Sequence, residues 1–244
     1  MLSESEAIVL RSYSLREADL LVSFFTRAEG KVKGVARSAK KSRRRFGGAL
    51  EPLTYVRLYW EDRERAELAR VDSCEILDSP LAHSIDYPRA VALGHVAEVL
   101  DELLPEREPN DAVFRLALAT LQRLQAGSIW TPLTYFELWM ARLTGLLPSL
   151  SECVVCTEQL GPARAFFHPM ADGLLCSRDK RLASTEIAQR SRQLGLQMLR
   201  APIESFSAMD KTAAADLRRF LVQLLERHME KNLVTATMLD RLED

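Results

Sequence analysis

The hydrophobic period of this 244-residue chain changes once, and the change divides it into two kinds of structure. Up to residue 79, apolar residues come in short runs separated by turn signals, a pattern that is typical of β-strands. Five short strands with no long helix between them fit a small closed barrel better than an open sheet covered by helices. The predicted strands are 7–10, 20–25, 31–36, 53–60 and 66–77.

The alternation within one predicted strand supports the barrel. Val56, Leu58 and Trp60 share one face of the strand, which predicts a core face, while Tyr55 and Tyr59 lie on the other, partly wet face. A hairpin turn before the third strand is predicted at the glycine of position 30, because that turn needs a positive φ.

After residue 80 the apolar residues follow helical spacing. Asp86 and Asn110 are predicted to cap two helices, Thr131 and Pro132 open a third, and an amphipathic helix is predicted around 217–228. The sequence therefore predicts an α+β chain with a barrel domain over residues 1–79 and a helical domain over 80–244.

Charge is segregated along the chain, although 33 basic residues nearly balance 34 acidic ones. The stretch 31–45 has basic side chains and no Asp or Glu, and such a stretch neutralises phosphates and favours nucleic-acid binding. A run of like charge is also typical of a solvated loop without a ligand. The candidate nucleic-acid contacts, ending with one aromatic ring for base stacking, are Lys31, Lys33, Arg37, Lys40, Lys41, Arg43, Arg44, Arg45 and Phe46.

Three cysteines mark a small module inserted at about 150–182. Cys153 and Cys156 form a Cys-x2-Cys pair, and Cys176 follows at the spacing of a structural zinc ribbon. Asp179 stands where the fourth cysteine of such a ribbon would be, and His168 is the alternative fourth ligand. The sequence leaves two interpretations open: the module binds one structural zinc ion, or it is a ribbon that has lost its metal and is stabilised by side-chain packing.

Searches for catalytic and targeting motifs find none. The sequence has no phosphate-binding loop, dinucleotide fingerprint, zinc-protease motif or hydrolase elbow, so we expect neither an enzyme nor a bound nucleotide. No apolar run approaches the roughly 18 residues that cross a bilayer, and no signal peptide is recognisable. We therefore expect a cytoplasmic protein without a membrane partner.

The ordered motifs resemble the bacterial RecO family of recombination mediators, and the resemblance covers nearly the whole chain. It depends on five segments: 7–13 (AIVLRSY), 30–37 (GKVKGVAR), 46–53 (FGGALEPL), 143–148 (LTGLLP) before the first cysteine pair, and 173–176 (GLLC). Members that carry the full cysteine module have a fourth cysteine where this chain has Asp179, so the chain departs from the family pattern there.

The resemblance implies an oligonucleotide/oligosaccharide-binding (OB) barrel followed by a helical domain with an inserted zinc-ribbon-like module. It implies a non-enzymatic DNA-repair factor, associated with the bacterial nucleoid during repair, that binds single- and double-stranded DNA and anneals complementary strands coated with single-strand-binding protein (SSB). The implied partners are the C-terminal tail of SSB, RecR, in some members RecF, and indirectly RecA, which the family helps to load. Two alternatives are an RNA-binding accessory factor that uses the same barrel and a metal-dependent nuclease.

Overall fold

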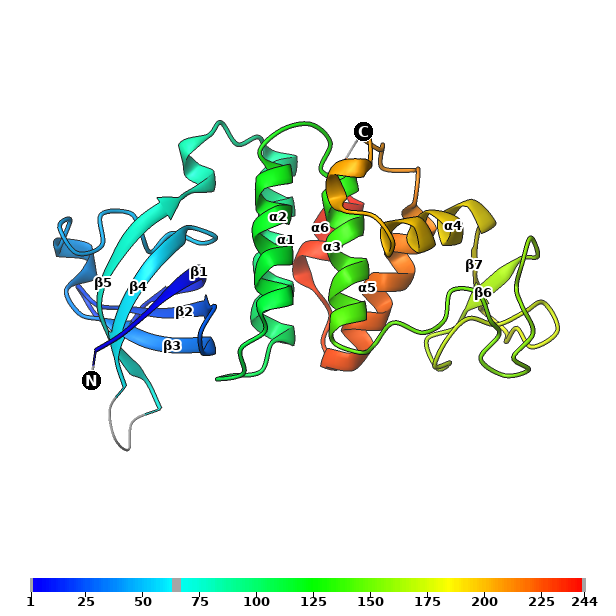
Figure 1. The fold of residues 1–244 in the computed structure, drawn as a ribbon, viewed down its shortest axis with the longest axis horizontal. Coiled ribbons are helices and arrows are strands. Elements are labelled where there is room, and N and C mark those ends of the chain that lie inside the picture. Colours follow the sequence, from blue (N-terminus) through cyan, green and yellow to red (C-terminus); the bar gives the residue numbers. More distant parts are fainter. Residues whose placement is uncertain (1, 63–66, 243–244) are drawn as a thin grey trace. The chain divides into compact units, whose positions relative to one another are not determined.

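A closed five-stranded barrel of the OB type forms the start of the chain (Figure 1). The strands pair in the order β1-β2-β3-β5-β4, and β4 returns to β1. All pairs are antiparallel except β3 and β5, which run parallel. The predicted small barrel is confirmed, with strands β1 (Leu2–Ser14), β2 (Leu20–Thr26), β3 (Gly30–Ala36), β4 (Tyr55–Glu61) and β5 (Ala69–Asp78).

The computed structural model describes residues 2–62 and 67–242. Ala66, the predicted first residue of the fifth strand, lies outside this part of the chain. The chain divides into two compact units, Met1–Gln125 and Ala126–Asp244. The sequence instead places a domain boundary after residue 79, where strands give way to helices, and that boundary stays a prediction. Within the described residues, no helix has the length and apolar character to cross a membrane.

The barrel interior contains the predicted apolar face of β4. Val56, Leu58 and Trp60 are buried in one hydrophobic cluster, and Tyr55 is half-buried on the opposite face. The chain between β3 and β4 contributes side chains to this cluster, including Phe46, Ala49 and Leu50. This connection therefore closes one end of the barrel with apolar side chains.

Two helices complete the first unit: α1 (Tyr87–Leu103) and α2 (Asp111–Leu124). Both predicted caps are confirmed, because the backbone N–H of Arg89 donates to Asp86 and that of Val113 donates to Asn110. The α2 side chain Phe114 packs against rings on β2 and β4, with centroids 5.5 Å from Phe25 and 6.2 Å from Tyr55. Tyr55 is therefore partly covered by α2.

The second unit consists of a group of helices and a small cysteine-containing module that lies to one side of them (Figure 1). The module lies between α3 (Trp130–Leu143) and α4 (Gln189–Met198), and its two short strands, β6 (Ala165–Phe167) and β7 (Thr185–Ile187), pair antiparallel. Its Phe167 ring packs edge-on against Phe220 of α5 (Ala215–Met229), with centroids 4.8 Å apart. The last helix of the second unit is α6 (Val234–Asp240). Short 3-10 turns occur at Ala39–Lys41 and Pro80–Ala82 in the first unit and at Ile203–Ser205 in the second.

Candidate nucleic-acid interface and metal-binding cluster

The structure separates the predicted basic run into a part that is bound to partners within the first unit and an exposed part without carboxylate partners in the described residues. Lys31 lies in β3 and is only 8% exposed, and its Nζ donates to the backbone oxygen of Asp101 at 2.6 Å. Burial lowers the pKa of Lys31. Lys33, two residues on, forms a 2.5 Å ion pair with Glu106, whose hydrogen bond raises the pKa of Lys33. Both lysines are thus engaged within the first unit and are poorly placed for a phosphate.

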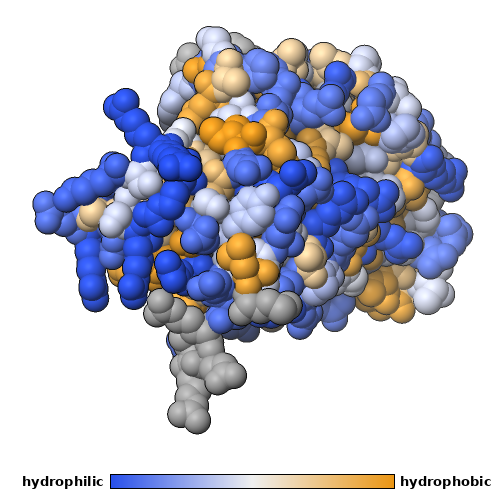
Figure 2. All heavy atoms as spheres, turned by 60° about the vertical axis from the view of Figure 1, so that its left-hand side comes forward, coloured by the Kyte–Doolittle hydropathy of each residue, from blue (hydrophilic) through white to orange (hydrophobic). Residues whose placement is uncertain are grey.

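The exposed part of the run lies on the connection between β3 and β4. None of its five exposed cations forms an ion pair with a carboxylate in residues 2–62 and 67–242. Figure 2 brings the barrel forward, and long hydrophilic side chains project from that side. We call the segment 37–44 the basic loop, and its five exposed cations are Arg37, Lys40, Lys41, Arg43 and Arg44.

Backbone hydrogen bonds fix the start of the basic loop. The N–H of Ser38 donates to Asp19 Oδ1 at 2.8 Å, and the N–H of Lys40 donates to the oxygen of Ala18 at 3.2 Å. Both acceptors lie just before β2 begins. Ser38 adopts a left-handed conformation with φ of 55°, which turns the chain into the 3-10 turn that follows. The loop backbone is therefore held while its charged side chains remain in solvent.

The end of the basic loop is fixed by Arg45 and Phe46. Arg45 donates to the backbone oxygen of Arg37 at 2.7 Å, and its own backbone oxygen accepts from the N–H of Cys74 on β5 at 3.0 Å. Phe46 is 4% exposed, and the Arg45 guanidinium lies 4.9 Å from its ring centroid. The base-stacking role predicted for Phe46 does not fit this geometry, because the ring fills the end of the barrel. Arg45 serves mainly to hold the loop.

Two cations that the sequence analysis missed line a hollow of about 240 Å³ beside the basic loop. Arg16 comes from the turn between β1 and β2, and Arg70 comes from the start of β5. Arg37 of the basic loop lines the same hollow. Each missed arginine is isolated in the sequence, so charge density alone does not reveal it. The positions of Arg16 and Arg70 in the chain did indicate a binding role, since OB barrels bind oligonucleotides with the loops after β1 and β4, and these arginines lie in or next to those two loops.

The acidic residues near the end of α1 face the barrel. Asp101 forms a 2.8 Å ion pair with Arg11 of β1 and accepts a 2.8 Å hydrogen bond from Ser23 of β2. Glu102 pairs with the same arginine at 3.0 Å. These two carboxylates bind Arg11 on β1, and the Glu106 carboxylate, just after α1, binds Lys33 on β3. The five cations of the basic loop have no such partner in the described part of the chain. Near-neutral composition is therefore compatible with a locally cationic surface.

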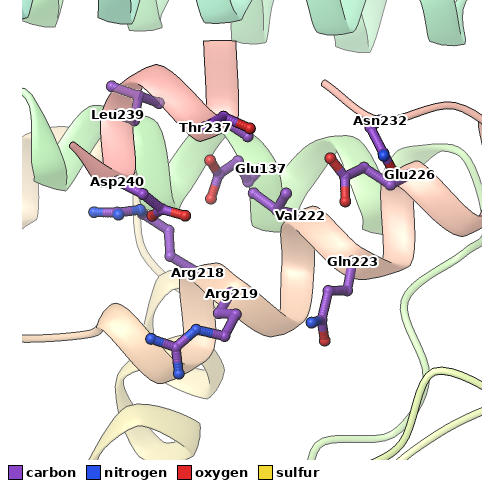
Figure 3. A pocket seen from close by; sticks show the side chains of 11 residues that line it. Glu137, Arg218, Arg219, Val222, Gln223, Glu226, Asn232, Thr237, Leu239 and Asp240 are labelled. Carbon is purple, nitrogen blue, oxygen red and sulfur yellow. The ribbon is translucent and has the colours of Figure 1, made fainter. Parts of the chain in front are cut away.

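A second charged feature, in the second unit, is a pocket of about 350 Å³ between α3, α5 and α6 (Figure 3). Arg218, which is 6% exposed, lies 4.1 Å from the ring centroid of Trp130. Glu226 accepts a hydrogen bond from the backbone N–H of Leu233. Glu137 and Asp240 also line the pocket, so both signs of charge occur in it. It lacks the excess of cations that distinguishes the basic loop.

The cysteine module brings its predicted ligands together. The ligand atoms of Cys153, Cys156, Cys176 and Asp179 all lie within 4.8 Å of one another. The Sγ atoms of Cys156 and Cys176 are 3.8 Å apart, and zinc–sulfur bonds of about 2.3 Å at a tetrahedral angle give about the same separation. Asp179 Oδ2 lies 3.2 Å from the sulfurs of both Cys153 and Cys176. Three thiols and one carboxylate thus form a cluster that can bind a metal ion.

The alternative fourth ligand is not part of this cluster. His168 Nδ1 accepts a 3.1 Å hydrogen bond from the backbone N–H of Met170 instead. Among residues 2–62 and 67–242, no other group of three or more His, Cys, Asp or Glu side chains gathers as a potential metal site.

Hydrogen bonds within the cluster shift its proton affinities. Thiol hydrogen bonds, chiefly from Cys156 and Cys176, lower the pKa of Asp179. The bond to Asp179 raises the pKa of Cys156 to about 11. Burial raises the pKa of Cys153, but backbone N–H groups outweigh that effect and the net shift is downward. A metal ion would have to displace these thiol protons, so binding is expected to weaken in acid.

Comparison with known proteins finds related sequences over nearly the whole chain. The family model "Recombination protein O N terminal" matches residues 1–80, and "Recombination protein O C terminal" matches residues 85–236. A protein named DNA repair protein RecO from Koribacter versatilis is 66% identical over 245 residues, covering 100% of both chains. A protein of the same name from Anaeromyxobacter sp. (strain Fw109-5) is 32% identical over 241 residues, covering 96% of this chain and 94% of the relative.

Proposed function

The chain belongs to the RecO family of DNA repair proteins, and from that premise we propose that it binds single- and double-stranded DNA and anneals complementary strands. The observation that carries the proposal is the basic loop. Five exposed cations without a carboxylate partner in the described structure lie on a connection whose backbone is hydrogen-bonded at both ends. Cations in this arrangement bind phosphates and release condensed counterions.

Annealing follows from the same electrostatics. Base pairing is favourable, but two strands repel each other until their phosphates are screened. A surface that neutralises phosphates on both strands lowers that barrier and raises the local concentration of each strand near the other. The process breaks no covalent bond, so it requires neither a nucleotide nor a catalytic residue, and we propose that the protein is not an enzyme.

The partner proteins follow from family membership. We propose that the chain acts on strands coated with SSB, recognises the acidic C-terminal tail of SSB, and cooperates with RecR, and with RecF where it is present, to help load RecA. Removing SSB from a strand costs free energy, and simultaneous binding to the SSB tail and the exposed strand offsets part of that cost. The support for these partners is the family resemblance and the full-length match to proteins named RecO.

The metal-binding cluster is proposed to hold one structural zinc ion. Cys153, Cys156, Cys176 and Asp179 would be its ligands, and the ion would join the two ends of the module, as structural zinc does in small folds with little core of their own. The donor set fits zinc, since three soft sulfurs and one oxygen can surround it tetrahedrally. Asp179 makes the site weaker than a four-cysteine ribbon, because a carboxylate is a rare ligand in structural zinc sites.

Annealing of complementary oligonucleotides, bare or coated with SSB, tests this function. The protein should accelerate annealing in both cases, and a variant with alanine at the five basic-loop positions should be slow in both. Lys33→Ala is the matched control, because Lys33 belongs to the same run but pairs with Glu106. Equal rates for the protein and the five-alanine variant would show that annealing, if present, uses another surface.

A further inference from the structure

The basic loop contributes cations to two separate hollows of the barrel. One hollow, of about 240 Å³, is lined by Arg16, Arg37 and Arg70, and we call it the arginine hollow. The other, of about 570 Å³, is lined by Lys40 and Arg43, and we call it the lysine hollow. The two hollows have no lining residue in common. The loop therefore presents cations toward two distinct spaces.

The arginine hollow combines three guanidinium groups with apolar side chains. Among its described lining residues the one acid is Asp19, and its Oδ1 accepts a hydrogen bond from the backbone N–H of Ser38. Arg70 is 3.5 Å from Glu61, at the long end of ion-pair distances, and 46% of its side chain is exposed. Guanidinium groups bind phosphate oxygens through paired N–H donors. Leu15 lines the same hollow and is 45% exposed, so an apolar surface lies beside the phosphate donors.

The lysine hollow is shaped by backbone as well as by charge. Gly47 and Gly48 line it, and both have positive φ, 35° and 92°. Among the described residues, no atom outside Gly48 and its two chain neighbours lies within 4 Å of where a Cβ would be placed on Gly48. Space without a side chain at this point admits the close approach of a sugar-phosphate backbone. Lys40 and Arg43 outnumber the acid Glu51 among the lining residues, so the hollow keeps a net positive charge.

We propose that the two hollows bind two nucleic-acid strands at once, one strand in each hollow. The cations that line the hollows would screen the repulsion that opposes pairing. The inference rests on the proposed annealing function and adds to it a stoichiometry of two strands per chain and a second site that contains Arg16 and Arg70. A protein with one site would have to bring two strands together by dimerising or by exchanging them.

The test compares a double variant, Arg16→Ala with Arg70→Ala, against Arg57→Ala. Arg57 is a close match for Arg70, since it lies on the same barrel, is 43% exposed and is 3.5 Å from Glu4. Native mass spectrometry with a short non-complementary oligonucleotide gives the number of strands per chain. Stopped-flow fluorescence with complementary oligonucleotides gives the annealing rate.

The full protein and Arg57→Ala should each bind two strands per monomer at saturation. The double variant should bind one strand and anneal at least about tenfold more slowly, because charge-assisted contacts to phosphate are lost. One strand per monomer for the full protein, or two for the double variant, would overturn the two-hollow inference and leave the annealing function standing if annealing persists. Absence of binding and annealing by the full protein would instead refute the proposed function itself.

Discussion

Replacing the five cations of the basic loop with alanine is expected to remove most of the salt dependence of single-strand binding. The structure identifies these five because they are exposed and have no carboxylate partner in the described part of the chain. Lysines and arginines already paired with carboxylates contribute less, since a phosphate must first displace the carboxylate.

The magnitude follows from counterion release. Each phosphate neutralised on a single strand contributes about −0.7 to the slope of log affinity against log salt concentration. If each of the five residues contacts one phosphate, they contribute about −3.5 together. Between about 50 and 200 mM salt, that slope corresponds to a loss of roughly 100-fold in affinity. The five-alanine variant should lose this component of the slope and keep whatever other cations supply.

Fluorescence anisotropy with a labelled oligonucleotide at several salt concentrations measures the slope. Single substitutions provide a matched comparison. Lys41→Ala should flatten the slope by about 0.7, whereas Lys33→Ala should leave it nearly unchanged because Lys33 pairs with Glu106. If the five-alanine variant keeps the slope of the full protein, the loop does not contact phosphates. Equal effects of the two lysine substitutions would refute the distinction between cations that are paired with a carboxylate and cations that are not.

Three further predictions follow from buried, metal-binding and paired side chains. Phe46→Ala should lower the free energy of unfolding by about 3–5 kcal/mol in denaturant titrations, while the folded variant keeps its affinity for DNA. A loss of DNA affinity without destabilisation would contradict the position of the Phe46 ring in the barrel core. In the presence of a chelator, Asp179→Cys should retain more zinc per chain than the full protein, and Asp179→Ala should retain less, as measured by elemental analysis. Equal zinc retention by the full protein and the two variants would exclude Asp179 as a ligand. The hydrogen bond from Lys33 lowers the pKa of Glu106, so the stability that this bond contributes is present above the unfolded-state pKa and is lost as the pH falls through the folded-state pKa. In thermal unfolding, Glu106→Gln should be less stable than the full protein at neutral pH, and the difference in stability should disappear below about pH 4. A difference that stays constant down to about pH 2 would refute the assignment.

Local patterns predicted the local structure well. The alternation in β4 gave the correct core face, and Asp86 and Asn110 cap the helices that they were expected to cap. The spacing of Cys153 and Cys156 placed both in one cluster with the third cysteine. In each case the determining interactions span few residues, or the ligand chemistry restricts the spacing, so the sequence alone contains the information.

Long-range packing determined what the sequence did not show. Nothing near Lys31 and Lys33 indicates that a helix end some 70 residues later supplies their partners. Phe46 adjoins a charged, exposed run, and only the closed barrel shows that its ring is needed in the interior. Arg16 reaches the interface because the barrel brings the β1–β2 turn beside the start of β5.

Mapping the contact sites of a bound strand tests the central claim most directly. A single-stranded oligonucleotide carrying photoreactive bases can be crosslinked to the full protein, and mass spectrometry then locates the crosslinked peptides. We predict crosslinks in the segment 37–48, with Arg16 and Arg70 in neighbouring crosslinked peptides. Crosslinks confined to the second unit, with none in the barrel, would contradict a nucleic-acid interface built on the basic loop.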